Sequence, residues 1–291
     1  MAVGLSSGSI AIYDTSKSLT KTLSAHTSTV WALKTLTKGR MVSGSLDTYV
    51  KVWNTTSWSL ISSYCCFVGG AMDIIQIDDD TIAATRGSSS PDTGSFTVWS
   101  ISKNTTIRSV YLNYWGRSLL LLPNKLIASG DGNGNLQFWN YTSSTYDVAV
   151  MTKAASAGYT IFDIVLIDSQ YLATGATDNY IKIWDYSQYT SVTLFKTLNG
   201  HTSTVRCLSL LSSQYLVSGS YDKSVRVWDL STYTQYTKLT TTNYVYAVDY
   251  FTTSVPISAD NAKQLIYWNM TTAASISTKT TASVGYSLAT F

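Results

Sequence analysis

Aromatic residues close a strand-like segment at regular intervals along the chain, and this repeat constrains the fold more than any other feature. Each is followed by Asp, Asn or Ser, and the positions are Tyr13, Trp53, Trp99, Trp139, Trp184, Trp228 and Trp268. They are separated by 40, 46, 40, 45, 44 and 40 residues. A period of roughly 40–45 residues is that of a four-stranded antiparallel blade in a β-propeller. We therefore predict an all-β fold with seven blades.

Two copies of the repeat are complete. Residues 25–54 and 200–229 each have a His at the second position, continue through Ser-Gly-Ser and Asp, and have a Trp at the next-to-last position. Between these residues, apolar side chains alternate with polar ones in three short runs, separated by Ser-rich breaks and a tight turn. Such alternation predicts short antiparallel strands joined by hairpins. No segment of convincing length has a helical period.

The pattern GH…SGSxD…VWD resembles the WD-repeat β-propeller family, and the resemblance covers the entire chain. It implies that each blade runs from an inner strand beside a central channel to an outer strand. It also implies a structural relay of hydrogen bonds among a His, a Ser or Thr, an Asp and a Trp. Two blades carry the full relay, which consists of His26, Ser43, Asp47 and Trp53 in one and His201, Ser218, Asp222 and Trp228 in the other.

The two ends of the chain are expected to complete one blade together. Residues 1–24 supply only three strands, and the missing inner strand is residues 284–291, whose sequence VGYSLATF matches TVWALKTL of the second blade. Pairing these segments removes both exposed sheet edges and closes the ring. We therefore expect residues 1–291 to form a single propeller. A natural permutation and a domain cut from a longer protein remain open as alternatives.

The residues that could perform chemistry have simpler structural explanations. The chain has only two histidines, and both occupy the relay. The acidic run 78–80 lies in a turn, and Asp73 and Asp163 occupy equivalent inner-strand positions, which shared ancestry explains. The glycines of residues 130–134 lack the strand-to-helix context of a phosphate loop. We expect no catalytic residue, no metal site and no cofactor, and therefore not an enzyme.

Charge and cysteine content bear on partners and location. The net charge is +3, and the basic residues are scattered singly, which gives no electrostatic footprint for nucleic acid. No window has the apolar length of a membrane span. Three cysteines, two of them adjacent at Cys65 and Cys66, cannot form a disulfide framework, so we expect reduced, buried thiols and a cytoplasmic protein.

The inner ring of strands holds the candidate binding residues. The resemblance implies that a peptide binds over the channel mouth through residues at the start of each inner strand. Aligning these strands, and adding one turn residue, selects Trp31, Met72, Trp115, Arg117, Phe162, Thr204, Arg206, Tyr221, Tyr244, Tyr246 and Tyr286. Aromatic residues and arginine are enriched in binding hot spots. The simpler alternative is that some of these side chains only pack between neighbouring blades.

The leading hypothesis is a non-catalytic scaffold that binds a peptide or protein loop through the aromatic residues and two arginines. The first alternative is a structural or sensor repeat domain of a larger multidomain signalling protein. A minor alternative is a carbohydrate-binding propeller, because Tyr and Trp can stack on sugars. The long loop Arg86–Ser95 is expected on the same face as the two histidines, and its part in binding is left open.

Overall fold

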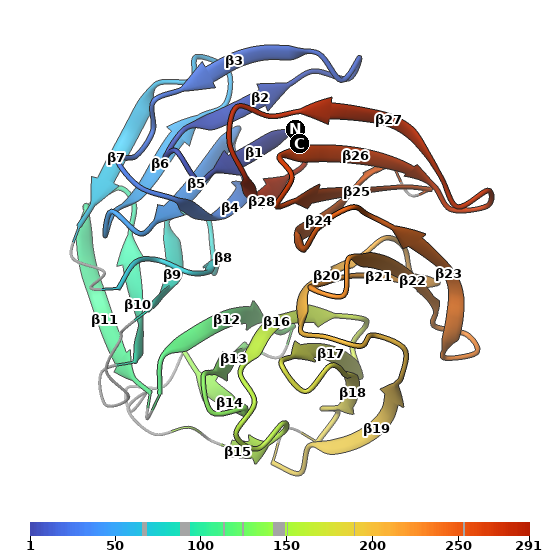
Figure 1. The fold of residues 1–291 in the computed structure, drawn as a ribbon. Coiled ribbons are helices and arrows are strands. Elements are labelled where there is room, and N and C mark those ends of the chain that lie inside the picture. The colour runs from blue at the N-terminus through green and yellow to red at the C-terminus, as the bar shows by residue number, and fades with distance from the viewer. Residues whose placement is uncertain are drawn as a thin grey trace.

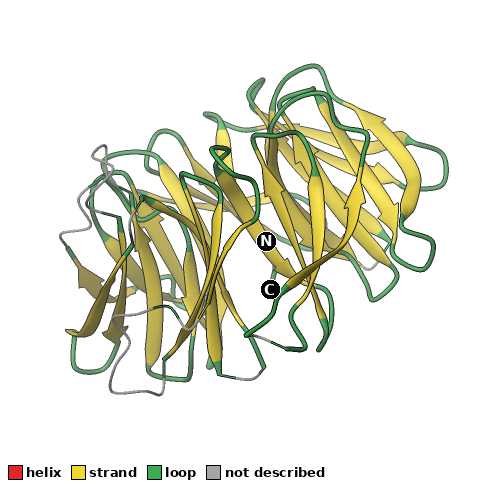
Figure 2. Ribbon diagram, turned by 90° about the horizontal axis from the view of Figure 1, so that it is seen from below, coloured by secondary structure: helices red, strands yellow, loops and turns green. Residues whose placement is uncertain are grey.

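The structure is a computed structural model, which describes residues 1–65, 69–87, 94–112, 114–123, 125–141, 149, 151–188, 190–252 and 254–291. These residues form 28 strands in seven four-stranded antiparallel sheets, and they include no helix. The sheets stand around a common centre like the blades of a propeller (Figure 1). Figure 2 shows the same ring from the side, with loops at both ends of the strands. The predicted seven-bladed fold is confirmed.

We number the blades 1 to 7 in chain order. Blade 1 consists of β28 (Gly285–Ala289), β1 (Ala2–Leu5), β2 (Ile10–Tyr13) and β3 (Leu19–Leu23); blade 2 of β4 (Val30–Leu36), β5 (Arg40–Ser45), β6 (Val50–Asn54) and β7 (Leu60–Tyr64). Blade 3 consists of β8 (Ile74–Gln76), β9 (Thr81–Arg86), β10 (Ser95–Ser100) and β11 (Thr105–Tyr111); blade 4 of β12 (Gly116–Leu121), β13 (Leu126–Asp131), β14 (Asn135–Asn140) and β15 (Met151–Ala154).

The remaining three blades repeat this order from the inner to the outer strand. Blade 5 consists of β16 (Ile161–Leu166), β17 (Tyr171–Ala176), β18 (Ile181–Asp185) and β19 (Thr193–Leu198); blade 6 of β20 (Val205–Leu210), β21 (Tyr215–Ser220), β22 (Ser224–Asp229) and β23 (Thr234–Thr240). Blade 7 consists of β24 (Val245–Thr252), β25 (Val255–Asp260), β26 (Gln264–Asn269) and β27 (Ala274–Thr280). The inner strands contact one another in sequence around the channel.

The ring closes through the two ends of the chain. Strand β28 pairs with β1 in antiparallel register, with Ala289 opposite Ala2 and Leu288 opposite Val3. The termini therefore lie beside each other, as Figure 1 shows. This is the closure expected from residues 1–24 and 284–291, and it leaves neither terminal strand as an exposed edge.

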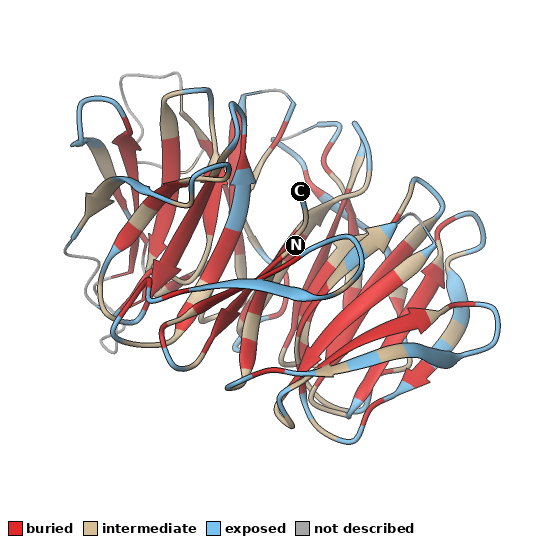
Figure 3. Ribbon diagram, turned by 90° about the horizontal axis from the view of Figure 1, so that it is seen from above, coloured by how far each residue is buried: buried red, intermediate tan, exposed pale blue. Residues whose placement is uncertain are grey.

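The hydrophobic core lies between neighbouring sheets. Burial is nearly complete along the two middle strands of each blade, whereas the innermost strands are partly buried and the outermost strands are largely exposed (Figure 3). Strand β10, for example, is buried at every position, while β27 has no buried residue. Alternating apolar side chains thus cover both faces of each sheet, because each sheet has a neighbour on either side. The low content of charged residues follows from this packing.

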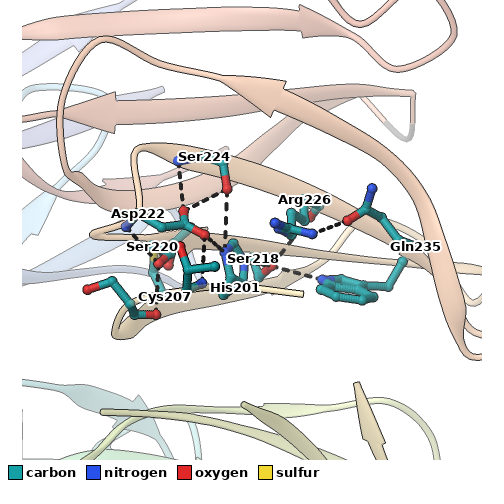
Figure 4. A network of polar contacts seen from close by, with 12 residues as sticks. His201, Cys207, Ser218, Ser220, Asp222, Ser224, Arg226 and Gln235 are labelled. Carbon is teal, nitrogen blue, oxygen red and sulfur yellow. Dashed lines mark hydrogen bonds and ion pairs between the residues drawn. The ribbon is translucent and has the colours of Figure 1, made fainter. Parts of the chain in front are cut away.

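The predicted relay residues are hydrogen-bonded to one another in blades 2 and 6. His201 Nε2 lies 2.7 Å from Ser218 Oγ and its Nδ1 lies 2.8 Å from Asp222 Oδ2, as Figure 4 shows. Trp228 Nε1 donates to the same Ser218 hydroxyl at 2.9 Å. His26 makes the equivalent contacts, 2.8 Å to Ser43 and 2.9 Å to Asp47. Both imidazoles are buried and engaged on both nitrogens, which leaves them no free site for chemistry.

Five blades keep the part of the relay that joins indole to hydroxyl. The Trp Nε1 donates to a Ser or Thr hydroxyl at 2.8–3.0 Å in the pairs Trp53–Ser43, Trp139–Ser129, Trp184–Thr174, Trp228–Ser218 and Trp268–Ser258. The alignment missed the last of these pairs because blade 7 lacks the other relay residues. In blade 3, Ala84 occupies the hydroxyl position, and the buried Nε1 of Trp99 has no hydrogen-bond partner in the described part of the chain.

In blade 5 a lysine contacts the turn aspartate that a relay histidine contacts in two other blades. Lys182 Nζ lies 2.7 Å from Asp178 Oδ2 and also donates to the backbone oxygen of Ala155 and the hydroxyl of Ser156. The equivalent Lys51 in blade 2 reaches only the backbone oxygen of Ala25, because His26 already holds Asp47 there. The lysine therefore secures the turn of blade 5 in the absence of a histidine.

The prediction of three reduced, buried cysteines is wrong for Cys65. Its side chain is exposed just after the outer strand β7, and it is disulfide-bonded, whereas Cys207 is buried and free. An outer position does not shield a thiol as the inner strand of Cys207 does. Cys66 and residues 88–93 of the long loop lie outside the described residues. The cytoplasmic location therefore stays a prediction.

Among the residues that the structure describes, there is no helix whose length and hydropathy would allow it to cross a membrane. The acidic run 78–80 is engaged locally at two of its carboxylates. Asp79 pairs with Lys38 at 2.9 Å, and Asp80 accepts from the hydroxyls of Ser100 and Ser102. These contacts fix the turn between β8 and β9 against its neighbours.

Candidate functional site

The channel mouth is built by residues at which the inner strands leave regular pairing. In six blades the pairing register shifts at one residue of the inner strand, as in a β-bulge, and these residues are Trp31, Arg117, Phe162, Arg206, Tyr246 and Tyr286. A bulge leaves one residue unpaired and re-aims its side chain. The repeat therefore presents one aromatic or arginine side chain from each of these six blades at the same place in the ring.

Two arginines, one from the inner strand of blade 4 and one from that of blade 6, are sandwiched between aromatic rings. The Arg117 guanidinium carbon lies 4.6 Å from the ring centroid of Trp115 and 5.1 Å from that of Phe162. The Arg206 guanidinium carbon lies 4.7 Å from the centroid of Phe162 and 5.2 Å from that of Trp31. These distances are within the range of cation–π attraction. Blades 2, 4, 5 and 6 thus meet across the channel through side chains alone.

Tyrosines continue the stack around the rest of the mouth. Ring centroids lie 4.7 Å apart for Trp31 and Tyr286 and 4.5 Å apart for Tyr286 and Tyr246. Tyr221, in the turn after β21, then lies 5.6 Å from Tyr246 and 5.3 Å from Tyr244. We call these nine side chains the mouth cluster: Trp31, Trp115, Arg117, Phe162, Arg206, Tyr221, Tyr244, Tyr246 and Tyr286.

The other two residues that sequence selected lie beside the mouth cluster. Arg117 Nη1 lies 3.8 Å from the sulfur of Met72. The backbone oxygen of Thr204 accepts from the N–H of Tyr221 at 3.1 Å and so fixes the turn that carries this tyrosine. The equivalent bond recurs in the other blades, for example from Leu46 N–H to the oxygen of Thr29.

Packing explains more of the mouth cluster than sequence reasoning expected. Within it only Tyr244 is exposed, at 42%, and the other members are half-buried. Most of these ring contacts join neighbouring blades, as the simpler alternative supposed, and the contact between Arg206 and Trp31 crosses the channel from blade 6 to blade 2. The mouth is therefore a rigid, largely aromatic surface closed over a small cavity. A cavity of about 110 Å³ lies beneath it, bordered by Trp31, Arg117, Phe162, Arg206 and Tyr246 among others.

Gly132 explains how Trp115 reaches its place. A Cβ at this glycine would lie 1.3 Å from Trp115 Nε1, so the indole occupies the space that a side chain would fill. Gly132 also donates its N–H to the backbone oxygen of Trp115 at 3.0 Å. The glycine-rich turn therefore makes room for the indole of Trp115 in the mouth cluster. The run of glycines at residues 130–134 was the feature of the sequence that could have indicated a close approach there.

Exposed apolar residues surround the mouth on the loops of the same face. They lie in the turns and connections that flank the inner strands, and the exposed fractions are Leu46 37%, Tyr49 41%, Tyr159 52% and Tyr180 43%. Sequence alignment did not select them, because they stand outside the inner strands. Together with Tyr244, they extend the aromatic surface outward over blades 2, 5 and 7.

A layer of carboxylates lies farther along the inner strands. Asp73 accepts from its neighbour Ile74 N–H and, across the blade boundary, from Leu119 N–H, both at 2.8 Å. Asp163 likewise accepts from Leu208 N–H of the next blade at 2.8 Å. These carboxylates tie adjacent inner strands together, which is a structural use for the two equivalent positions.

The charges of this layer perturb one another. Removal from water, reinforced by the carboxylate of Asp73, raises the pKa of Asp163 to about 6. Burial likewise raises the pKa of Asp73 and of Asp249. Lys34 faces all three carboxylates, and their field raises its pKa against the opposing effect of desolvation. Within the described residues there is no cluster of His, Cys, Asp or Glu placed to hold a metal ion.

The arginines above this layer carry charge without a direct ion pair. Desolvation, and secondly the charge of Arg206, lowers the pKa of Arg117 to about 10, which leaves it protonated at neutral pH. No carboxylate of a described residue lies within ion-pair distance of either guanidinium. The enclosed Nε atoms of both arginines and the Nε1 of Trp31 have no hydrogen-bond partner among the described residues. The mouth thus carries positive charge and encloses unpaired donors.

Comparison with known proteins agrees with this architecture. Residues 17–54, 159–185 and 192–229 match the family model described as WD domain, G-beta repeat. The chain is 24% identical over 170 residues to apoptotic protease-activating factor 1 of Rattus norvegicus, a match that covers 56% of this chain and 13% of the relative. The chain therefore spans a small part of the length of that curated relative. Three stretches of the chain thus match the WD repeat, and the chain folds into a closed ring of seven four-stranded blades.

Proposed function

We propose that this propeller is a non-catalytic interaction module that binds a peptide or protein loop over the channel mouth. The observation that carries the proposal is the mouth cluster, in which six blades contribute unlike aromatic and arginine side chains at one equivalent position. Packing alone does not require such a composition, since a repeated small apolar residue would close the ring as well. Rigid aromatics bury much partner surface at little entropic cost.

The binding mechanism follows from the two kinds of side chain. Apolar groups of the partner pack on Tyr244 and the exposed residues Leu46, Tyr49, Tyr159 and Tyr180. An acidic group of the partner is attracted by Arg117 and Arg206. Because the aromatic rings already hold both arginines in place, little side-chain freedom is lost on binding.

A capture experiment compares the Trp31→Ala/Arg117→Ala double variant with wild type. Partners retained from native lysate by wild type should be lost from the double variant. The matched control is Tyr111→Ala, which removes a 73% exposed tyrosine from the outer strand β11. Equal capture by all three folded proteins would place the binding site elsewhere.

One observation favours a second candidate, a structural or sensor segment of a larger protein. The matched relative is a protease-activating factor of which this match covers only 13%. The mass of the denatured polypeptide from its natural source distinguishes a separate interaction module from a segment of a larger protein. A mass well above 31.9 kDa supports the second candidate, whereas a mass of that size contradicts it.

A further inference from the structure

The two guanidinium groups at the channel mouth form an unusual electrostatic arrangement. Both stack on one ring, that of Phe162, so two positive charges lie close together at one cavity. Like charges in a partly desolvated site repel each other, and the lowered pKa of Arg117 reflects that. An arrangement of this kind is costly unless an anion offsets it.

The nearest acidic groups do not supply that anion. Asp73 and Asp163 border the same cavity, but each carboxylate already accepts two backbone N–H groups, one of them from the next blade. Neither lies within ion-pair distance of an arginine, since the described ion pairs involve other residues. Lys34 borders the cavity as well, and Asp249 lies farther along the inner strands. Apart from the contact of Arg117 Nη1 with the Met72 sulfur, the arginine donors are therefore not satisfied from within the described residues.

Size and chemistry restrict what the cavity can take. Its volume of about 110 Å³ is room for a few water molecules, each of which takes roughly 30 Å³ in the liquid. A single carboxylate or phosphate group fits such a space, whereas a peptide segment does not. Guanidinium groups offer planar forks of N–H donors that match these oxyanions.

We propose that the cavity beneath the mouth cluster is a binding site for one small oxyanion, held by the guanidinium N–H groups of Arg117 and Arg206 and bordered by the indole of Trp31. The rings of Trp115, Phe162 and Trp31 contact the flat faces of the two guanidinium groups and fix their positions. The N–H groups at the edges of the guanidiniums stay available to bind the oxyanion, which makes the site specific. This inference deepens the proposed function. It depends on the proposed function only for the source of the oxyanion, which is a carboxylate or phosphate group of the bound partner. Binding of the free ion requires no partner.

The indole N–H resonances of the protein provide a specific reporter. Trp31 Nε1 has no hydrogen-bond partner among the residues that the structure describes, whereas the indole N–H groups of Trp53, Trp139, Trp184, Trp228 and Trp268 donate to relay hydroxyls. Sodium phosphate and sodium acetate are titrated separately into the ¹⁵N-labelled chain at constant ionic strength, with chloride as the balancing ion. We expect a saturable shift of the Trp31 resonance and unchanged relay resonances.

Variants separate specific binding from general charge effects. Arg206→Met and Arg117→Met should each weaken oxyanion binding about tenfold, because a hydrogen bond to a charged group contributes about that factor or more. Lys223→Gln, which removes an exposed positive charge from the turn beside Tyr221, should leave it unchanged. Unshifted relay resonances show that a variant is folded. The wild-type titration tests the site even if a variant fails to fold.

The results distinguish this site from the proposed function. A saturable shift with phosphate or with acetate supports the site, and the preferred ion tells which group the partner contributes. No Trp31 shift with either ion overturns the site, even if the Trp31→Ala/Arg117→Ala variant loses its partners. A saturable shift together with undiminished partner capture by that variant supports the site and contradicts the proposed function.

Discussion

Arg117 and Arg206 come from adjacent arcs of the ring and share one aromatic neighbour, with guanidinium carbons 5.1 and 4.7 Å from the ring centroid of Phe162. Blades 4 and 6 are thus joined through a side chain of blade 5 that lies between them. This relationship makes Phe162 the centre of the mouth cluster, and it ties the integrity of the ring to the same residues that present the candidate binding surface.

Replacing Phe162 should weaken both the stability of the ring and the candidate binding surface. Phe162→Leu keeps an apolar side chain but removes two cation–π contacts, and we expect a loss of about 1–2 kcal/mol in the free energy of unfolding. Denaturant unfolding measures this. The control is Phe195→Leu, at a 45% exposed position of the outer strand β19 whose ring contacts only other aromatics among the described residues. A smaller loss for Phe162→Leu than for the control contradicts the central role of this ring.

A missing hydroxyl in blade 3 gives an opportunity to stabilise the fold. Ala84→Ser places a hydroxyl at the position from which the other blades bind their closing tryptophan, and Trp99 Nε1 is unpaired there. We expect a gain of about 1 kcal/mol, the net contribution of one hydrogen bond. Ala173→Ser, one residue before Thr174 on a buried strand, adds a hydroxyl without an indole partner and should destabilise. Equal changes in the free energy of unfolding for the two variants would contradict a hydrogen bond between the new hydroxyl and Trp99.

The carboxylate of Asp163 should titrate near neutrality. Burial and the neighbouring Asp73 raise its pKa to about 6, against the field of Lys34 and Arg206, while Asp249 lies farther along the channel. Because the folded state binds this proton more tightly than the unfolded chain, the contribution of Asp163 to stability increases as the pH falls from 7 towards 4. ¹³C carboxyl shifts, assigned with Asp163→Asn, should give a midpoint near 6. A midpoint near the ordinary value of about 4 contradicts the account.

Gly132 allows a test of whether Trp115 belongs to the binding surface without removing any side-chain atom of the mouth cluster. Gly132→Ala introduces a Cβ where Trp115 Nε1 now lies, so the indole must move away from Arg117. The backbone at this glycine is not in the left-handed region, and the change should leave overall stability within about 1 kcal/mol of wild type. Partner capture should nevertheless fall. Full capture by a folded Gly132→Ala protein would exclude Trp115 from the binding surface.

Much of the fold followed from the sequence because the repeat is periodic. The closing aromatics predicted the seven blades, and the split first blade predicted the pairing of β28 with β1. The ring residues were found by aligning inner strands. Their contacts were not, because the meeting of Arg117, Phe162 and Arg206 depends on how three separate blades are placed around the channel. The carboxylates that link blades at Asp73 and Asp163 depend on that arrangement as well.

Photo-crosslinking from the mouth tests the central claim most directly. A photoreactive amino acid replaces Tyr244, the 42% exposed member of the mouth cluster, and in a second protein it replaces Tyr111 on the outer strand β11. After irradiation with partners captured from native lysate, the account predicts crosslinked partner at position 244 and none at position 111. Crosslinking at 111 with none at 244, in folded proteins that both retain the partner, would contradict binding over the channel mouth.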